Sequence, residues 1–347
     1  MSGGVDSSVA AALLVRQGYE VVGMTMRVAS GEGRESSSKA CCTLDAAEDA
    51  RRVAQKLDIP HYVLNYIQRF EQEVISDFIS EYLAGRTPNP CSRCNQRVKF
   101  GARYEKALAI EADAIATGHY VRLEPRNGRH ALRRAVHLAK DQSYTLSGLS
   151  QEQLGRAAFP LGELTKEATR DIARDLGLVT ADKPESQEIC FVPDDNYRNF
   201  LAKRTVPAKP GPIVSMSGEV LGEHTGLVNY TVGQRKGLGI AAPKPLYVVR
   251  LDMARNTLVV AHEDEANCHA LTAGQVNWCA LPPQTEPFDC EVQIRYKSRP
   301  IPCTVYPSNA GFEARFHEPQ RAVTPGQWAV LYEDDYVLAA GIIDHSA

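Results

Sequence analysis

The chain begins Met1-Ser2-Gly3-Gly4-Val5-Asp6-Ser7-Ser8, and this stretch decides the fold. Its two glycines carry no Cβ, so backbone N–H groups there can approach an anion closely, and the serines add hydroxyl donors. The following residues, Val9 to Gln17, predict a helix that stops at Gly18. A helix N-terminus directly after Gly3-Gly4 attracts phosphate through its unpaired N–H groups and its dipole. We therefore expect a phosphate-binding loop at the start of an α/β domain.

Asp6 sets this loop apart from one that only neutralises phosphate, because a carboxylate beside phosphates suits a bound Mg²⁺. A Walker loop would need G-x-x-x-x-G-K-[ST], and residues 1–8 contain no lysine. The string Ser2–Ser8 instead resembles the PP-loop, SGGxDS, of the ATP pyrophosphatases. Those enzymes cleave ATP between its α- and β-phosphates and adenylate an oxygen of their substrate. The resemblance implies ATP and Mg²⁺ as cofactors, with Asp6 as a possible Mg²⁺ contact.

Length and composition indicate a globular protein of several domains. The chain has 347 residues, of which 44% are hydrophobic and 23% charged, and a domain contains roughly 150 residues. No apolar run approaches the roughly 20 residues of a membrane span, and no signal peptide precedes Ser2. We expect a cytoplasmic protein with no membrane partner and with its cysteines mostly reduced. Because the net charge is −3, any RNA site must be a local basic patch.

The first 120 residues alternate predicted strands and helices. The strands are expected at 21–26, 62–64 and 113–117, and the helices at 9–17, 44–57 (capped by Thr43), 70–85 and about 95–110. This alternation predicts a parallel sheet covered by helices on both faces, with ligands at the carboxyl ends of its strands, where Thr117-Gly118-His119 lies. One more helix is expected at 165–176.

From about Gly211 the pattern changes to short apolar runs between turn residues, which predicts antiparallel β-structure. We therefore expect three domains: a PP-loop ATP-binding catalytic domain over residues 1–198, a small β-rich domain over 199–268, and a C-terminal antiparallel β-barrel over 269–347.

Three of the nine cysteines suit chemistry. Cys91 and Cys94 form a C-x-x-C in a proline-rich loop, and Cys94 is expected in the first turn of the following helix, near cationic side chains (Arg93, Arg97 and Lys99). A helix N-terminus and nearby cations both lower the pKa of a thiol and so favour the nucleophilic thiolate. Cys190 lies in a polar stretch, residues 185–191, that leads into a predicted short strand.

Other interpretations of these cysteines remain. C-x-x-C can be half of a zinc site, but no second C-x-x-C and no H-x₃₋₅-H completes one. It can also be a thioredoxin-like dithiol, although the flanking residues differ, or a pair of structural cysteines. Cys41 and Cys42 are adjacent and cannot easily bridge each other. The cysteines of the β-region are expected to be packing residues: Cys268, Cys279, Cys290 and Cys303.

Seven motifs in order name a family. Besides SGGVDSS at 2–8, they are G-R-T-P-N-P-x-x-x-C-N-x-x-x-K-F (85–100), A-T-G-H-Y (116–120), K-D-Q-S-Y (140–144), I-C-F (189–191), G-Q-R-K-G-L-G-I (233–240) and T-P-G-Q (324–327). Together they closely resemble the tRNA-specific 2-thiouridylases, from residue 2 to the C-terminus. The resemblance implies that the protein replaces the C2 oxygen of the wobble uridine of tRNA by sulfur.

The resemblance also implies the partners of the reaction and the role of each of the two cysteines. Adenylation turns the C2 oxygen into a good leaving group, and sulfur arrives as a persulfide, supplied by a donor such as a cysteine desulfurase or a sulfur-relay protein. Carried over by position, Cys94 resembles the nucleophile and Cys190 the persulfide carrier, and the two would form a transient disulfide. Positions that match ATP contacts are Ser2, Gly3, Gly4, Val5, Asp6, Ser7, Ser8, Met26 and Gly118.

The resemblance also implies contacts to tRNA, with the β-rich domain at 199–268 as a tRNA-recognition domain. Asn89-Pro90-Cys91 matches the stretch that contacts the target base. The other tRNA-contacting positions are His119, Lys140, Asp141, Gln142, Arg295, Tyr296 and Gln327. A basic stretch supports RNA binding independently, since such charges bind phosphate without reading sequence: Arg122, Arg126, Arg129, His130, Arg133, Arg134 and Lys140. A solvated hairpin is the equal alternative for this stretch.

Two features depart from the family pattern. Many family members have Asp where this chain has Cys91, so Cys91 either lines the base pocket or joins Cys94 and Cys190 in holding a [4Fe–4S] cluster. A PP-loop also normally follows a buried β-strand, whereas here Met1 directly precedes Ser2. Either the start is misassigned or the first strand is absent, and a tRNA-binding protein with impaired catalysis is then an alternative. Other PP-loop ligases need neither paired cysteines nor a C-terminal barrel.

Overall fold

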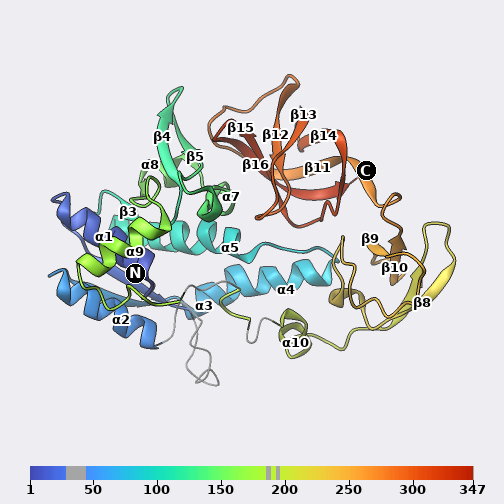
Figure 1. Ribbon diagram of the computed structural model, residues 1–347, viewed down its shortest axis with the longest axis horizontal. Helices are drawn as coiled ribbons and strands as arrows, with labels where there is room; N and C mark the ends of the chain where they lie inside the picture. Colours follow the sequence, from blue (N-terminus) through green and yellow to red (C-terminus); the bar gives the residue numbers. More distant parts are fainter. Residues whose placement is uncertain (29–43, 185–188, 193–195, 347) are drawn as a thin grey trace. The chain divides into compact units, whose positions relative to one another are not determined.

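A computed structural model describes residues 1–28, 44–184, 189–192 and 196–346 (Figure 1). Thr43, Cys41 and Cys42 lie outside the described residues. The chain divides into two compact units. Unit 1 comprises Met1–Ile75, Cys91–Asn196 and Asp335–Val337, and unit 2 comprises Ser76–Pro90, Tyr197–Asp334 and Leu338–Ala347.

Unit 1 contains the predicted parallel α/β structure. Strand β1 (Gly23–Arg27) pairs in parallel with β2 (His61–Asn65), and β3 (Ile115–Ala116) pairs in parallel with β6 (Ala157–Ala158). The main helices are α1 (Val5–Arg16), α2 (Leu44–Lys56) and α9 (Lys166–Asp175). Their core includes Val5, Val9, Val53 and Ala173, all buried, and α1 lies against α9 (Figure 1).

The first helix starts earlier than its apolar run predicts. It begins at Val5 rather than Val9, with Gly4 as its N-cap, so Asp6, Ser7 and Ser8 form its first turn. Val5 is 3% exposed and Ser8 is fully buried. Burial of these residues against the rest of unit 1 extends the helix to the glycines, which brings its N-terminus into the loop itself.

The predicted helix at 95–110 is also longer. It begins as α5 (Pro90–Arg93), continues as a π-helix, η2 (Cys94–Ala102), and ends as α6 (Arg103–Ala109). Proline is favoured at the first position of a helix because its missing N–H would be unpaired there. The prediction that Cys94 lies in the first helical turn is therefore wrong, since Cys94 follows that turn. A second π-helix, η1 (Glu71–Ile75), lies between α3 (Ile67–Phe70) and α4 (Ser76–Leu83).

Shorter elements complete unit 1. A hairpin is formed by β4 (Arg122–Arg126) and β5 (Arg129–Arg133). It is followed by η3 (Leu138–Lys140), α7 (Ser143–Leu146) and α8 (Gln151–Gly155). The strand predicted near Cys190 is wrong, because residues 189–192 form a turn. The apolar Phe191 and Val192 of that turn are 3% and 7% exposed, so they serve packing rather than a sheet.

Unit 2 begins its β-structure with a small sheet after α10 (Tyr197–Ala202). The strands are β7 (Gly211–Val214), β8 (Val220–His224), β9 (Tyr247–Asp252) and β10 (Thr257–Ala261), in the order β8-β7-β10-β9. A short turn of helix, η5 (Leu227–Asn229), follows β8. β7 and β10 pair in parallel, so this part is mixed rather than wholly antiparallel.

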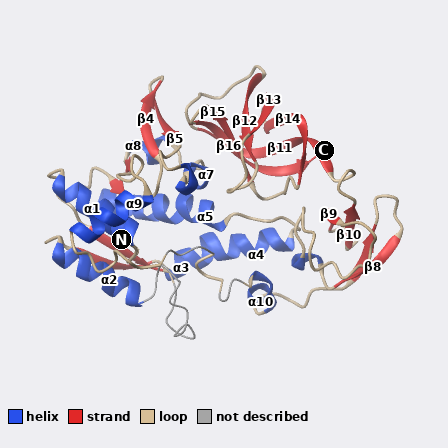
Figure 2. Ribbon diagram, viewed as in Figure 1, coloured by secondary structure: helices blue, strands red, loops and turns tan. Residues whose placement is uncertain are grey.

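The predicted C-terminal barrel is confirmed. Its strands are β11 (Asn267–Trp278), β12 (Phe288–Gln293), β13 (Ile301–Ser308), β14 (Gly311–Arg321), β15 (Trp328–Glu333) and β16 (Tyr336–Ser346) (Figure 2). They follow the order β11-β14-β13-β12-β15-β16, and antiparallel pairing of β11 with β16 closes the barrel. Trp328, Leu331 and Tyr332 of β15 are at most 2% exposed. Within the described ranges, no helix is long and apolar enough to cross a membrane.

Candidate functional site

The loop at residues 2–8 has the geometry of an anion site. The N-cap of α1, Gly4, offers no side chain to the N–H groups of the first turn, so these groups keep their capacity to bind an anion. Ser7 Oγ lies 3.0 Å from Ser2 N and 3.2 Å from Ser2 Oγ, which folds the loop over this N-terminus. The Ser8 hydroxyl is different, because it is buried and donates to Gly4 O at 2.9 Å. Ser8 therefore supports the loop and does not face a ligand.

Two glycines at this site lie so close to neighbouring backbone atoms that a side chain would not fit. Gly3 has φ +68°, and a Cβ there would lie 2.1 Å from Ala46 O of α2. A Cβ on Gly118, which follows β3, would lie 2.5 Å from the carbonyl carbon of Asp6 and 2.7 Å from Ser7 N. Gly118 thus packs directly on the first turn of α1, and the structure brings it together with residues 2–8. Met26, near the carboxyl end of β1, is 7% exposed.

A lysine that the sequence analysis missed reaches the same loop. Lys166 Nζ lies 2.6 Å from Asp6 Oδ1, and the Lys166 side chain is only 7% exposed. The Tyr120 hydroxyl lies 2.8 Å from the same oxygen and 3.0 Å from Thr169 Oγ1. Neither contact involves Asp6 Oδ2. The sequence does contain a sign of this contact. Lys166 lies in the first turn of α9, where the helix dipole disfavours a cation and an acidic partner stabilises it.

The segments that carry Cys94 and Cys190 meet at one helix of unit 1. Phe191, next to Cys190, packs edge-on against Phe70 of α3, with ring centroids 5.7 Å apart. α3 and the following η1 both contact η2, which begins at Cys94. Cys94 and Cys190 are half-buried and Cys91 is exposed.

The cations near Cys94 are held by other groups. Arg93 is 7% exposed, and its Nη1 lies 3.4 Å from Gln96 Oε1. Arg97 Nη1 donates to Glu73 O at 3.4 Å and lies 3.7 Å from Glu73 Oε2. These contacts of the two guanidinium groups anchor η2.

His119 connects the end of β3 to η2. Its Nε2 lies 3.5 Å from Lys99 Nζ, and its Nδ1 lies 2.7 Å from Thr117 Oγ1. Because an ammonium group can only donate, Nε2 accepts, and a neutral imidazole then donates from Nδ1 to Thr117. The ring is 9% exposed, so its predicted contact with tRNA is restricted to an edge.

The predicted tRNA residues 140–142 are partly used within the fold. Asp141 Oδ1 accepts from Ala135 N at 2.9 Å, and its Oδ2 accepts from the Ser143 hydroxyl at 2.6 Å. Burial raises the pKa of Asp141 above its usual value, against the opposing effect of these hydrogen bonds. Gln142 Oε1 accepts from Tyr120 N at 3.0 Å. Asp141 and Gln142 therefore hold the backbone that presents Lys140.

The residues of unit 2 that are predicted to contact tRNA also divide into those that make hydrogen bonds within the fold and one that is exposed. The Arg295 guanidinium donates to Ala322 O at 2.7 Å, to Thr324 Oγ1 at 2.9 Å and to Val232 O at 3.2 Å. Gln327 Nε2 donates to Thr87 O at 2.7 Å. Tyr296 is 36% exposed, which leaves part of its ring accessible. Asn89 and Pro90 belong to unit 2 and Cys91 to unit 1, so the predicted base-contacting stretch crosses the division.

Much of the positive charge of the β4–β5 hairpin is neutralised. Arg122 Nη2 lies 3.1 Å from Asp335 Oδ2, and Arg133 Nη1 lies 3.1 Å from Glu124 Oε1. The Arg126 guanidinium stacks 4.3 Å over the ring of Tyr336. Burial would raise the pKa of Glu124, but hydrogen bonds from Tyr336 and Arg133 outweigh it and hold that pKa below its ordinary value. Arg122 and Arg133 of the hairpin are therefore charge-paired rather than open to phosphate.

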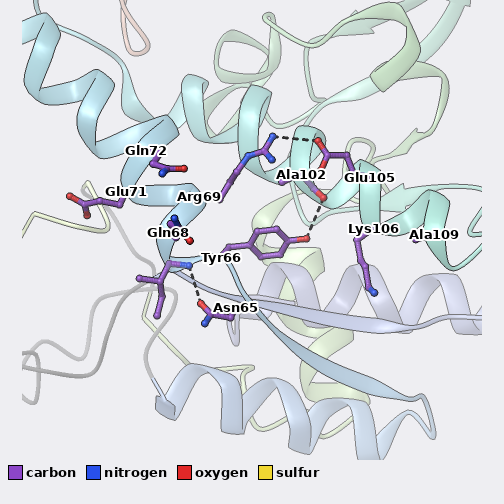
Figure 3. A pocket seen from close by; sticks show the side chains of 11 residues that line it. Asn65, Tyr66, Gln68, Arg69, Glu71, Gln72, Ala102, Glu105, Lys106 and Ala109 are labelled. Carbon is purple, nitrogen blue, oxygen red and sulfur yellow. Dashed lines mark hydrogen bonds and ion pairs between the residues drawn. The ribbon is translucent and has the colours of Figure 1, made fainter.

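A cavity of about 920 Å³ in unit 1 lies apart from these predicted residues (Figure 3). It is lined by residues of mixed charge and by amides: Asn65, Tyr66, Ile67, Gln68, Arg69, Glu71, Gln72, Ala102, Glu105, Lys106 and Ala109. An ion pair of 3.3 Å between Arg69 and Glu105 and a 3.3 Å hydrogen bond from the Tyr66 hydroxyl to Ala102 O occupy much of its polar wall (Figure 3).

The fold and this loop define an ATP-pyrophosphatase type of α/β domain joined to two β-domains. Family models match in the same order: the tRNA methyl transferase HUP domain at residues 1–194, the tRNA methyl transferase PRC-barrel domain at 198–262 and the aminomethyltransferase beta-barrel domain at 268–343. A solved NMN synthetase from Francisella tularensis covers 53% of the chain and 64% of its own length, at 17% identity and a TM-score of 0.32, too low for any argument.

Curated relatives match over the whole chain. The tRNA-specific 2-thiouridylase MnmA of Pelotomaculum thermopropionicum is 50% identical over an alignment of 349 positions that covers 99% of this chain and 96% of the relative. Those of Symbiobacterium thermophilum and Heliobacterium modesticaldum are each 48% identical, over 100% and 99% of this chain and 91% of each relative. The chain belongs to the tRNA-specific 2-thiouridylase family.

Proposed function

We propose that this protein uses ATP to replace the C2 oxygen of the wobble uridine of tRNA by sulfur, as a tRNA-uridine 2-sulfurtransferase of the cytoplasm. Membership of the family and the matched full-length relatives support the substrate and the reaction class. The observation that carries the proposal is that unit 1 contains both the uncapped N-terminus of α1, packed on Gly118, and two cysteine segments around α3.

The loop Ser2–Ser8 would hold the phosphates of ATP. The N–H groups of the first turn of α1 point toward the loop, and the helix dipole favours negative charge there. Gly3 and Gly118 keep the loop and β3 close enough for main-chain contacts, since a side chain at either position would collide with backbone atoms. Lys166 and Asp6 then set the charge beside the phosphates.

A Mg²⁺ ion fits this loop through Asp6. Its Oδ1 accepts from Lys166 and Tyr120, while its Oδ2 makes neither contact. Carboxylate oxygen is the ligand type that Mg²⁺ prefers, usually together with phosphate oxygens of the substrate. The ion would neutralise charge on the phosphates, and Lys166 would hold the carboxylate in place.

The two half-buried cysteines would carry sulfur. In the proposed sequence, the terminal sulfur of a Cys190 persulfide attacks C2 of the adenylated uridine and AMP leaves. The Cys94 thiolate then attacks Cys190 Sγ, which breaks the S–S bond to the base. The products are thiolated tRNA and a Cys94–Cys190 disulfide, which an external thiol reduces. Alternatively, Cys94 attacks the persulfide first and releases sulfide, and this route ends in the same disulfide.

Contacts to tRNA would come from exposed parts of the predicted set. Tyr296 has an accessible ring, which suits stacking on a base, and Lys140 offers an ammonium group to phosphate. Cys91, which is exposed, and the half-buried Asn89 would contact the target base, and the buried Pro90 would hold them at the start of α5. Asp141, Gln142, Arg295 and Gln327 would act by holding the backbone of these segments.

The cluster alternative has its own test. Across the residues that the structure describes, no three His, Cys, Asp or Glu side chains gather as metal ligands, so nothing in that part favours a [4Fe–4S] cluster on Cys91, Cys94 and Cys190. Iron bound in an anaerobic preparation, with absorbance near 400 nm and activity proportional to it, would favour the cluster. Full thiolation without iron excludes it.

The most direct test of function is mass spectrometry of tRNA nucleosides after incubation with the protein, ATP and a cysteine desulfurase with its substrate. We expect 2-thiouridine at the wobble position, and none when ATP is omitted. Retained tRNA binding with no thiolation, in the presence of several sulfur donors, would instead favour the alternative of a tRNA-binding protein.

A further inference from the structure

The nine-residue π-helix that begins at Cys94 is unusually long for this type of helix. A π-helix closes hydrogen bonds from i to i+5 and occurs mostly as a single turn inserted into an α-helix, frequently at functional sites. Here η2 covers Cys94–Ala102. Such a segment needs external contacts to persist, because an α-helix satisfies the same backbone with better geometry.

One side chain outside η2 contacts two of its carbonyl groups. Gln153 Nε2 donates to Gln96 O at 3.0 Å and to Phe100 O at 2.9 Å. A single amide therefore spans two carbonyls four residues apart and fixes the spacing between them. Gly101 fits this arrangement, since a Cβ there would lie 3.1 Å from Gln96 O.

Further contacts hold the start of η2 to the same region, residues 143–155. Asn95, directly after Cys94, is 2% exposed and donates through Nδ2 to Thr145 O at 3.0 Å. Gln96 Nε2 donates to Gly148 O at 3.1 Å. Val98 and Phe100 of η2 are buried, at 0% and 1% exposure. Cys94, the first residue of η2, is half-buried.

We propose that Gln153 is a positioning residue for Cys94: its double hydrogen bond holds the π-helical spacing of η2 and thereby the direction in which the thiol points. Each residue of an α-helix turns the chain by about 100°. A π-helical hydrogen bond spans one residue more than an α-helical one. Return of η2 to α-helical spacing would therefore rotate Cys94 by roughly 100° relative to the buried Phe100. This inference rests on the proposed role of Cys94 as the nucleophile.

Gln153 also has a second task that the test must separate. It is the third residue of α8, and its Oε1 accepts from Ser150 N while the Ser150 hydroxyl accepts from Gln153 N, which is a capping box. Gln153→Glu keeps this cap, because Glu is a normal capping-box residue, but it replaces the donating amide by an anion facing two carbonyls. Gln153→Met removes the donors without adding charge. Ser150→Ala removes the reciprocal side-chain cap and leaves Gln153 Nε2 in place.

The experiment compares these variants in the full chain with Cys94→Ser. Two readouts are needed: kcat for thiolation at saturating ATP and tRNA, and the pH profile of Cys94 alkylation by iodoacetamide, read by peptide mass spectrometry with Cys268 as internal reference. We expect kcat to fall on the order of 100-fold in both Gln153 variants, since a displacement of about 1 Å can cost this much. The KM for ATP should stay unchanged, the alkylation profile of Cys94 should shift, and Ser150→Ala should stay within about twofold of the wild type.

Each outcome decides one question. Wild-type kcat and an unchanged Cys94 profile in the two Gln153 variants would overturn the inference. An equal loss in Ser150→Ala would also overturn it, because the effect would then come from the stability of α8. If Gln153→Glu fails to fold, Gln153→Met carries the same test. Full activity of Cys94→Ser would instead show that the proposed function of Cys94 is wrong, whatever Gln153 does.

Discussion

Cysteine occurs in both units, in very different surroundings. Cys94 and Cys190 of unit 1 are half-buried and lie at helix and turn segments around α3. In the barrel of unit 2, Cys290 and Cys303 face each other across β12 and β13, with their sulfur atoms 3.9 Å apart. The hydrogen bond to Cys303, together with burial and nearby negative charges, raises the pKa of Cys290 above its usual value.

The difference shows how the surroundings set the chemistry of one residue type. A thiol whose pKa is raised stays protonated and is a poor nucleophile, so the barrel pair suits packing. Of the four cysteines predicted to be packing residues, Cys279 and Cys303 are fully buried, whereas Cys268 and Cys290 are half-buried. Sulfur chemistry should therefore depend on the cysteines of unit 1 and be indifferent to those of the barrel.

The largest expected effect comes from the cysteines of unit 1. Cys94→Ser and Cys190→Ser should each reduce thiolation below about one thousandth of the wild-type rate, because removing a nucleophile removes the covalent step. Nucleoside mass spectrometry after a timed incubation measures this, and tRNA binding should persist. Cys268→Ser in unit 2 is the matched control and should keep full activity. Comparable losses of thiolation in all three variants would contradict the claim that the sulfur chemistry depends on the cysteines of unit 1.

The next largest effect concerns the phosphate loop. Gly3→Ala should lower kcat/KM for ATP on the order of 100-fold, since a Cβ would stand 2.1 Å from Ala46 O and displace the loop from the N-terminus of α1. Gly18 also has positive φ, +83°, but nothing lies within 4 Å of its Cβ position. Gly18→Ala therefore imposes similar backbone strain without the collision and should keep near-normal ATP kinetics. Similar losses in both variants would point to strain alone.

A smaller effect is expected at the lysine of α9. Lys166→Met removes the buried partner of Asp6 and should lower kcat about tenfold while the KM for tRNA stays unchanged. The control is Lys183→Met, since Lys183 makes an ion pair of the same length, 2.6 Å, but with Asp49. Steady-state kinetics with varied ATP and tRNA measure both variants. An increase in the KM for tRNA alone would place Lys166 in RNA binding instead.

A pH effect is expected at Asp141. Its pKa is raised by burial, so the folded state favours the protonated form. Between the ordinary value of 3.8 and the raised value, the folded protein binds more protons than the unfolded chain, and stability falls as pH rises. Asp141→Asn lacks this loss, so its free energy of unfolding relative to the wild type should rise with pH over that range. Urea unfolding at a series of pH values measures it, and a constant difference would contradict this assignment.

The last prediction concerns the barrel. Cys303→Ala should lower the free energy of unfolding by about 1 kcal/mol, because a fully buried sulfur is lost from the core. Thiolation at a temperature well below the unfolding midpoint should be unchanged. Thermal unfolding and the tRNA assay together measure this pair of outcomes, and a loss of activity without loss of stability would undermine the contrast between the two groups of cysteines.

Sequence reasoning predicted the architecture well where local patterns dominate. The Gly3-Gly4 turn before α1, the alternation of helix and strand, and the barrel all follow from spacing and turn residues. It failed where packing overrides local pattern. The π-helix at Cys94 depends on Gln153, which is 59 positions further along the chain, and no pattern near residue 94 encodes that contact.

The candidate site shows the same limit. The motif register assigned Gly118 and Asp6 to one predicted ATP site, and in the structure Gly118 packs on Asp6 with no room for a side chain. It did not reveal Lys166, which reaches Asp6 from a helix 160 residues away. It also treated Arg295 and Gln327 only as RNA contacts, whereas their hydrogen bonds to backbone carbonyls give them a structural role. Side-chain partners that are distant in sequence cannot be assigned from spacing.

One measurement tests the central claim, that Cys94 and Cys190 transfer the sulfur, most directly. The protein, loaded with persulfide, is mixed with ATP and tRNA for a single turnover, quenched in acid and digested without reductant for peptide mass spectrometry. The account predicts a Cys94–Cys190 disulfide in an amount equal to the 2-thiouridine formed, and no 2-thiouridine when ATP is omitted. Full formation of 2-thiouridine without that disulfide, or with one on Cys290 and Cys303 instead, would contradict it.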